Sequence, residues 1–182
     1  MPQKATHSAR PHGRRSSRAL PAGIGVPIVA NHSVRHALPA GSLVLTTRGE
    51  RLVEGLRPGD EVITRDHGKA TVREIVVAST TTRDRMVHIT QGCLGNHRPD
   101  RDLRLPPDQP VVLRDWRALT LFGAKEARVA VGRLIDGQLI RMGDSAEATV
   151  YSIVLDWPAA LFVDGLEIVS GSVGAIEALR SA

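Results

Sequence analysis

Few side chains in this sequence could act as nucleophiles. Cys93 is the single cysteine, so the chain can form neither an internal disulfide nor a metal site with several cysteine ligands. Free cysteine is among the most buried residue types, and we therefore expect Cys93 to be a small core side chain rather than a nucleophile. Ser42, at the start of an apolar run, is the other candidate. Both stay open as candidates for covalent catalysis.

The histidines and glycines show no pattern typical of a metal or cofactor site. His88 alternates with Val87 and Ile89, which favours a satisfied or solvent-facing histidine on a strand over a catalytic one. No glycine-rich loop is followed by Lys-Ser or Lys-Thr, the sequence that cradles phosphates. Four further histidines have spacings that match no ligand pattern: His7, His12, His32 and His36. We therefore predict no cofactor and no metal.

The elements that must position these residues are short strands. Apolar and β-branched runs, separated by turn signals about every 8–12 residues, predict an all-β domain that is closed or strongly curled. Pro58-Gly59 and Asp164-Gly165 predict turns, the second a two-residue hairpin turn. With 3% aromatic residues, the core must consist of Val, Leu, Ile and Ala. We expect strands at 42–46, 61–64, 70–78, 86–90, 102–105, 111–113, 127–130, 138–141, 149–155, 160–163 and 166–169.

Between these strands, Asp115-Trp116-Arg117 leads into a loop around Phe122-Gly123 and allows two interpretations. It is either a surface recognition cluster or a tryptophan packed over the domain with an Arg–Asp pair at its rim.

The positive charge is concentrated at the N-terminus. Residues 1–36 contain six Lys or Arg and no acidic residue, whereas the rest of the chain carries a net charge of −1. We expect this segment to be a disordered basic arm, which could attract phosphates of nucleic acid or anionic membrane without specific recognition. Its arginines include Arg10, Arg14, Arg15 and Arg18.

The segment 19–34 is too short and too interrupted by proline to span a bilayer, and it makes a poor secretory signal. We therefore expect no transmembrane segment and a soluble protein, cytoplasmic rather than exported.

The opening of the expected β domain resembles the Hedgehog/intein (Hint) domain family, in particular its bacterial branch. The resemblance rests on Gly41-Ser42, Gly49, Val53-Glu54, Leu56 and Gly59-Asp60. It continues in order through later segments, over roughly residues 37–170. The later segments are Cys93-Leu94-Gly95, Arg98-Pro99, Arg101 to Pro107, Arg133 to Gly137, and Tyr151 to Glu167. The resemblance implies a compact, horseshoe-like β fold without disulfides.

The family's chemistry needs a Cys or Ser as the first residue of the domain, which attacks the preceding carbonyl. A His then protonates the departing amide nitrogen. Here the nucleophile position is Ala37, and the Ser/Thr-Pro-x-His motif begins with Pro106 and ends with Gln109. Trp157 stands where related bacterial domains often carry another His. The resemblance therefore implies a domain that is degenerate for self-cleavage.

Three functions follow as hypotheses. The first is a structural or binding module with an unknown protein partner, the second autoprocessing with Ser42 or Cys93 as a non-standard nucleophile. The third is nucleic-acid or membrane binding through the arm. We expect a monomer with a basic arm at 1–36, a Hint-like β domain at 37–170 and a tail at 171–182. In the tail, Ile176 and Leu179 have helical spacing.

Overall fold

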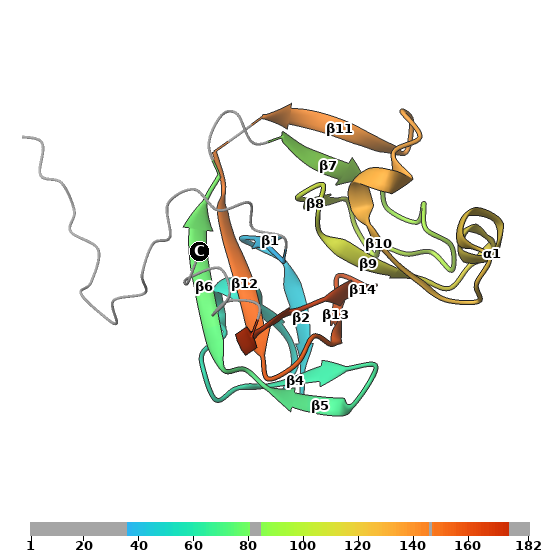
Figure 1. Cartoon of the computed structure of the whole chain (residues 1–182). Helices are drawn as coiled ribbons and strands as arrows, with labels where there is room; N and C mark the ends of the chain where they lie inside the picture. Colours follow the sequence, from blue (N-terminus) through green and yellow to red (C-terminus); the bar gives the residue numbers. More distant parts are fainter. Residues whose placement is uncertain (1–35, 81–84, 146, 175–182) are drawn as a thin grey trace, which may run out of the picture.

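The chain folds into a β domain, described by a computed structural model (Figure 1). The structure describes residues 36–80, 85–145 and 147–174. The strands are β1 (Leu38–Pro39), β2 (Leu43–Thr46), β3 (Gly49–Leu52), β4 (Glu61–Thr64), β5 (Gly68–Thr71), β6 (Glu74–Ser79), β7 (Arg85–Ile89), β8 (Leu103–Leu105), β9 (Pro110–Leu113), β10 (Ala127–Ala130), β11 (Ile140–Ser145), β12 (Thr149–Leu155), β13 (Ala160–Val163), β14 (Leu166–Val169) and β15 (Gly171–Ser172). The helical elements are η1 (Val53–Gly55), α1 (Trp116–Phe122) and η2 (Val131–Leu134).

In the part of the chain that the structure describes, the strands form three sheets. The largest runs β10-β9-β14-β13-β2-β4-β5, with β3 paired to β2. In the second, β12 pairs antiparallel with β1 and β6 and parallel with β15. The third runs β11-β7-β8. In Figure 1, β6 and β12 extend side by side toward β7 and β11. The helix α1 connects β9 to β10.

The prediction of an all-β domain is confirmed, and five of the expected strands coincide with β4, β10, β12, β13 and β14. One expected strand is wrong, because 70–78 divides into β5 and β6. At Val72 the chain exchanges hydrogen bonds with the turn at Gly59 and Asp60, while Arg73 N donates to Val154 O on β12. The backbone thus changes from the largest sheet to the second within two residues, which alternation of side chains does not reveal.

A short helix replaces the loop expected around Phe122-Gly123. Asp115 caps its N-terminus by accepting from Arg117 N at 2.9 Å, and Gly123 ends it with a left-handed φ of 68°. Both residues are common signals of helix ends. Trp116 is 66% exposed, so it does not pack over the domain. Arg117 stacks over its ring at 5.0 Å and also pairs with Asp115.

The core is aliphatic, as expected from the composition. Among the described residues no aromatic side chain is buried. The largest fully buried side chains include Ile89, Leu105, Ile140 and Leu161. A smaller apolar cluster consists of Ala37, Ala78, Met86 and Val150.

A buried carboxylate connects the β13–β14 turn to the beginning of β2. Asp164, with φ 47°, occupies the predicted hairpin turn with Gly165. Its side chain accepts from Leu43 N at 3.3 Å and from Arg101 Nε at 2.6 Å, and Arg101 also donates to Gly41 O. Burial raises the pKa of Asp164, while Leu43 N and Arg101 oppose that shift. Arg101 is therefore the countercharge that lets this carboxylate remain buried.

The described domain is slightly longer than the expected 37–170. His36 is half-buried and contacts β14, and Gly171–Ser172 form the buried strand β15. The rest of the arm, with Arg10, Arg14, Arg15 and Arg18, lies outside the described residues, as does the helix expected at Ile176 and Leu179. No helix in the described ranges has the length and apolar character needed to cross a membrane.

Replacing Arg101 by alanine should destabilise the fold. The change leaves the buried Asp164 carboxylate without its countercharge, and we expect a loss of roughly 2 kcal/mol in the free energy of unfolding at pH 7. The deficit should shrink toward pH 4, because Asp164 has a raised pKa and below its unfolded pKa the carboxyl is protonated in both states. Denaturant unfolding at both pH values measures this.

Lys69→Ala is the matched control. It removes an exposed ion pair with Glu61 on the β4–β5 hairpin and should cost no more than about 0.5 kcal/mol. Equal losses in the two variants, or an Arg101→Ala deficit that grows in acid, would contradict the role assigned to Arg101.

Candidate functional site

The main-chain carbonyl of Val169, at the end of β14, brings together two distant parts of the sequence. Gln109 Nε2 donates to Val169 O at 3.0 Å, and His36 Nδ1 lies 3.0 Å from the same oxygen. A carbonyl only accepts, so Nδ1 is the protonated ring nitrogen of His36 in this arrangement. The peptide bond between His36 and Ala37 is thereby held in the neighbourhood of Gln109.

Gln109 is fully buried, and its amide group is committed to the backbone. Besides Val169 O, Nε2 donates to Pro110 O at 3.0 Å, so both amide hydrogens are used. The oxygen Oε1 is buried and has no hydrogen-bond partner among the described residues. Gln109 therefore acts as a double donor that fixes main chain, and an amide cannot release a proton near neutral pH.

The turn that carries Gln109 is itself held by the helix η2. Gln109 N donates to Pro106 O at 2.9 Å and closes the turn, while Val131 N donates to Gln109 O and Gly132 N donates to Pro107 O. Gly132 allows this close approach, since a Cβ there would lie 3.0 Å from Pro107 O. Pro106 offers no hydroxyl to the site.

Ala37 belongs to a small apolar cluster. It is 0% exposed and packs in the cluster with Ala78, Met86 and Val150. Its methyl group carries no hydroxyl or thiol, and neither do the side chains of these neighbours. The residue directly after the His36 carbonyl thus contributes packing rather than chemistry.

Ser42 is buried and already has a hydrogen-bond acceptor. Its Oγ donates to Pro39 O at 2.8 Å, and Ser42 N donates to the same oxygen at 3.2 Å. This arrangement closes the turn between β1 and β2. The hydroxyl of Ser42 therefore stabilises this turn.

Cys93 is half-buried and packs against the main core. Burial, opposed by the charge of Arg117, raises the pKa of the thiol. Because the thiolate is the nucleophilic form, this environment keeps Cys93 in its less reactive state near neutral pH. Its carbonyl oxygen accepts a hydrogen bond from Arg117 at 2.7 Å.

The other aromatic and imidazole groups have different neighbours. Trp157 is 50% exposed on the β12–β13 connection and meets the ring of His67 edge-on at 5.4 Å. On β7, His88 Nε2 lies 3.5 Å from Asp102 Oδ2. The structure therefore joins Ala37 and Gln109 through His36 and Val169, whereas the aromatic contact of Trp157 is with His67. In the described ranges, no cluster of three or more His, Cys, Asp or Glu could hold a metal ion.

Sequence reasoning missed His36, which we placed in a solvated arm. The available signal was its position directly before Ala37, at the expected domain boundary. Its acceptor, Val169, is 133 residues away in the chain, so no local pattern could indicate the contact.

Comparison with known proteins agrees on the fold. A family model described as the Hint domain matches residues 36–174. The solution structure of a bacterial intein-like domain from Clostridium thermocellum has a TM-score of 0.53 and 20% identity, and the similarity covers 75% of this chain and 98% of that domain. The crystal structure of the MchDnaB-1 intein has a TM-score of 0.48 and 11% identity, with 74% of this chain and 99% of the intein covered. No curated protein matches the sequence.

Replacing Gln109 by glutamate should destabilise the fold strongly. An ionised carboxylate cannot donate to Val169 O or Pro110 O and would be buried without a countercharge, so we expect a loss of about 3 kcal/mol at pH 7. The loss should diminish in acid, because burial raises the pKa of the introduced carboxyl and its protonated form is tolerated. Urea unfolding measures both effects.

Gln138→Glu makes the same chemical change at an exposed turn residue and should alter stability by less than about 0.5 kcal/mol. If Gln109→Glu were as mild as this control, the double-donor role of Gln109 would be wrong.

Proposed function

The chain belongs to the Hint domain family, and from this premise we propose that it is a member that has lost self-cleavage and acts as a structural or binding module. The observation that carries the proposal is the state of Gln109 beside the His36–Ala37 peptide bond. Both of its amide hydrogens are bound to main-chain carbonyls. The group at the position of the family histidine is thus a fixed structural donor.

Self-cleavage in this family would require two groups at the His36–Ala37 bond. A nucleophile must attack the His36 carbonyl, and an acid must protonate the Ala37 nitrogen as it leaves. Ala37 cannot provide the first, and Gln109 cannot provide the second near neutral pH. The remaining nucleophiles support the same proposal, since Ser42 Oγ is bound to Pro39 O and Cys93 has a raised pKa.

The stability of the arrangement also supports a structural role. Gln109 supplies two donors, to Pro110 O and Val169 O, where a neutral histidine supplies one, and His36 adds a third donor at Val169 O. Buried carbonyls that lose their donors cost about 1–3 kcal/mol each. The substitution therefore favours a static scaffold over a site that must move a proton.

The full-length protein should stay intact when it is incubated with a thiol nucleophile or with hydroxylamine. No ester or thioester forms at residues 36–37, so there is no bond for these reagents to attack. Intact-mass measurement over time should keep showing about 19.6 kDa. A growing fragment that begins at Ala37 would instead establish autoprocessing, and Ser42→Ala and Cys93→Ala would then identify the nucleophile.

Restoring both missing groups should restore cleavage if the scaffold is otherwise intact. We expect the variant Ala37→Cys with Gln109→His to release a hydroxylamine-dependent fragment starting at residue 37. Each single variant should release at least tenfold less, in line with the typical contribution of a general acid. Mass spectrometry quantifies the fragment.

Unfolding measurements on the same three variants separate lost structure from lost chemistry. Equal cleavage by the double variant and by Ala37→Cys alone would show that Gln109 is not the obstacle.

A further inference from the structure

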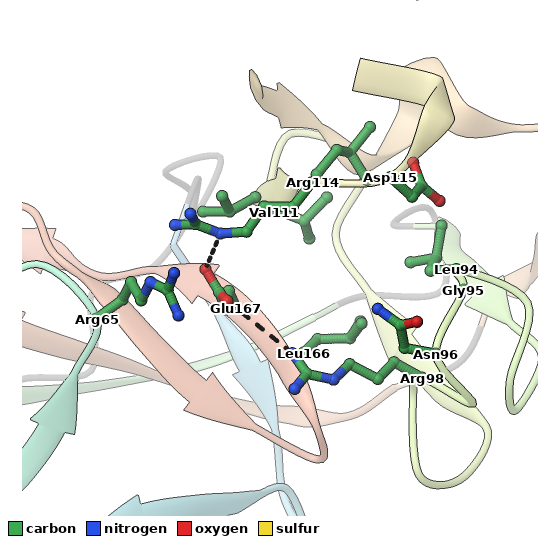
Figure 2. A pocket seen from close by; sticks show the side chains of 12 residues that line it. Arg65, Leu94, Gly95, Asn96, Arg98, Val111, Arg114, Asp115, Leu166 and Glu167 are labelled. Atoms are coloured by element: carbon green, nitrogen blue, oxygen red, sulfur yellow. Dashed lines mark hydrogen bonds and ion pairs between the residues drawn. The ribbon is translucent and has the colours of Figure 1, made fainter. Parts of the chain in front are cut away.

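A second concave site lies along β9 and β14, apart from the site around the Val169 carbonyl. A pocket of about 220 Å³ is formed by β9, the start of β14, the loop at 94–98, and Arg65 from the β4–β5 turn. Figure 2 shows its charged side chains, with Arg65, Arg98 and Arg114 extending toward Glu167 from three directions. None of these residues belongs to the positions compared with the family's cleavage machinery.

Glu167 forms the anionic floor of this pocket. Its side chain is 5% exposed, and its carboxylate lies 3.0 Å from Arg114 Nε and 3.9 Å from Arg98 Nη1. Arg114 is bound on both sides, because its Nη1 also lies 2.8 Å from Glu126 Oε2. The buried carboxylate thus orients Arg114, while the contact with Arg98 is too long for a hydrogen bond.

Arg65 contributes a guanidinium group that is not used elsewhere. Among the described residues its side chain has no hydrogen bond or ion pair, although its backbone is fixed by Arg65 N donating to Ala160 O at 2.8 Å. The next residue, Asp66, accepts from Ala160 N at 2.7 Å and pairs with Arg128. An anchored backbone therefore presents a free cation at the edge of the pocket.

The opposite wall is a tightly curved loop. Gly95, Asn96 and His97 all have positive φ, and Arg98 N donates to Gly95 O at 2.9 Å. Such backbone is costly for Asn96 and His97 and is often found at ligand sites. It places the Asn96 amide and the Arg98 guanidinium at the pocket.

The charges of the lining are not balanced. Asp115 at the far wall is neutralised by Arg117. The three arginines are opposed by Glu167 and, on the outer side of Arg114, by Glu126. One positive charge remains: among the described residues the Arg65 side chain has no hydrogen bond or ion pair, and Arg98 has only its 3.9 Å contact with Glu167, which Arg114 already holds.

We propose that this pocket binds a small phosphate-bearing anion. Arg65 and Arg98 donate to the phosphate oxygens, Asn96 adds an amide donor, and Glu167 keeps Arg114 in place behind them. Separate guanidinium groups arriving from different directions suit the tetrahedral oxygens of phosphate better than the two coplanar oxygens of a carboxylate. The proposal goes beyond the loss of self-cleavage, and neither depends on the other.

Calorimetric titration of the full chain with inorganic phosphate tests the site. We expect saturable binding that weakens about tenfold in Arg65→Ala and again in Arg65→Ala with Arg98→Ala, since each removes a charge-assisted donor. Glycerol 3-phosphate, titrated in parallel, distinguishes a phosphomonoester from free phosphate as the preferred source. Acetate should bind at least tenfold more weakly than either.

Two matched controls remove the same charge elsewhere. Arg104→Ala alters an exposed arginine on β8 outside the pocket, and Arg14→Ala with Arg15→Ala alters the N-terminal segment. Both should bind phosphate within twofold of the unmodified chain. Absence of saturable binding, equal weakening in the controls, or acetate binding as tight as phosphate would each overturn the proposal. The unfolding midpoint of each variant establishes that it is folded.

Discussion

The carbonyl of Val169 is the acceptor on which the start of the domain and the turn at 106–109 both depend. It lies at the end of β14, a strand enclosed between β9 and β13 in the largest sheet. His36 reaches it from the N-terminal side and Gln109 from the turn preceding β9. Because a buried carbonyl without a donor is costly, this single oxygen keeps both segments in place. The first described residues, His36 and Ala37, are thereby held near Gln109.

The same hydrogen bonds explain why the site is suited to structure rather than proton transfer. A catalytic acid must release its hydrogen, whereas Gln109 holds both of its amide hydrogens on main-chain oxygens. Ala37 also contributes to structure, since its buried methyl group packs in the small cluster around Met86. Oε1 of Gln109 remains the one unsatisfied atom of this arrangement among the described residues. These contacts of Gln109 and Ala37 support the proposed structural role of the site.

The β13–β14 hairpin concentrates buried negative charge in an otherwise aliphatic domain. Asp164 in its turn and Glu167 on β14 are both nearly inaccessible to water. Arg101 is the countercharge of Asp164, whereas Glu167 pairs closely with Arg114 and lies farther from Arg98. The loop at 98–101 therefore packs against the β13–β14 hairpin through ion pairs, chiefly that between Arg101 and Asp164. Buried Glu167 likewise needs a countercharge, and the arginines around it give the pocket its excess of positive charge.

The sequence by itself determined the strands that lie between strong turn signals, such as 149–155 and the hairpin at Asp164-Gly165. It also determined the absence of a nucleophile at Ala37, because residue type alone decides that. Local signals at Asp115 and Gly123 could have predicted α1, but they were outweighed by the β pattern around them. Only the tertiary structure decided which carbonyl Gln109 holds, that His36 contacts β14, and that Arg65, Arg98 and Arg114 line one pocket with Glu167. Those contacts join residues far apart in the chain, and side-chain periodicity reports the face of an element but not the element that packs against it.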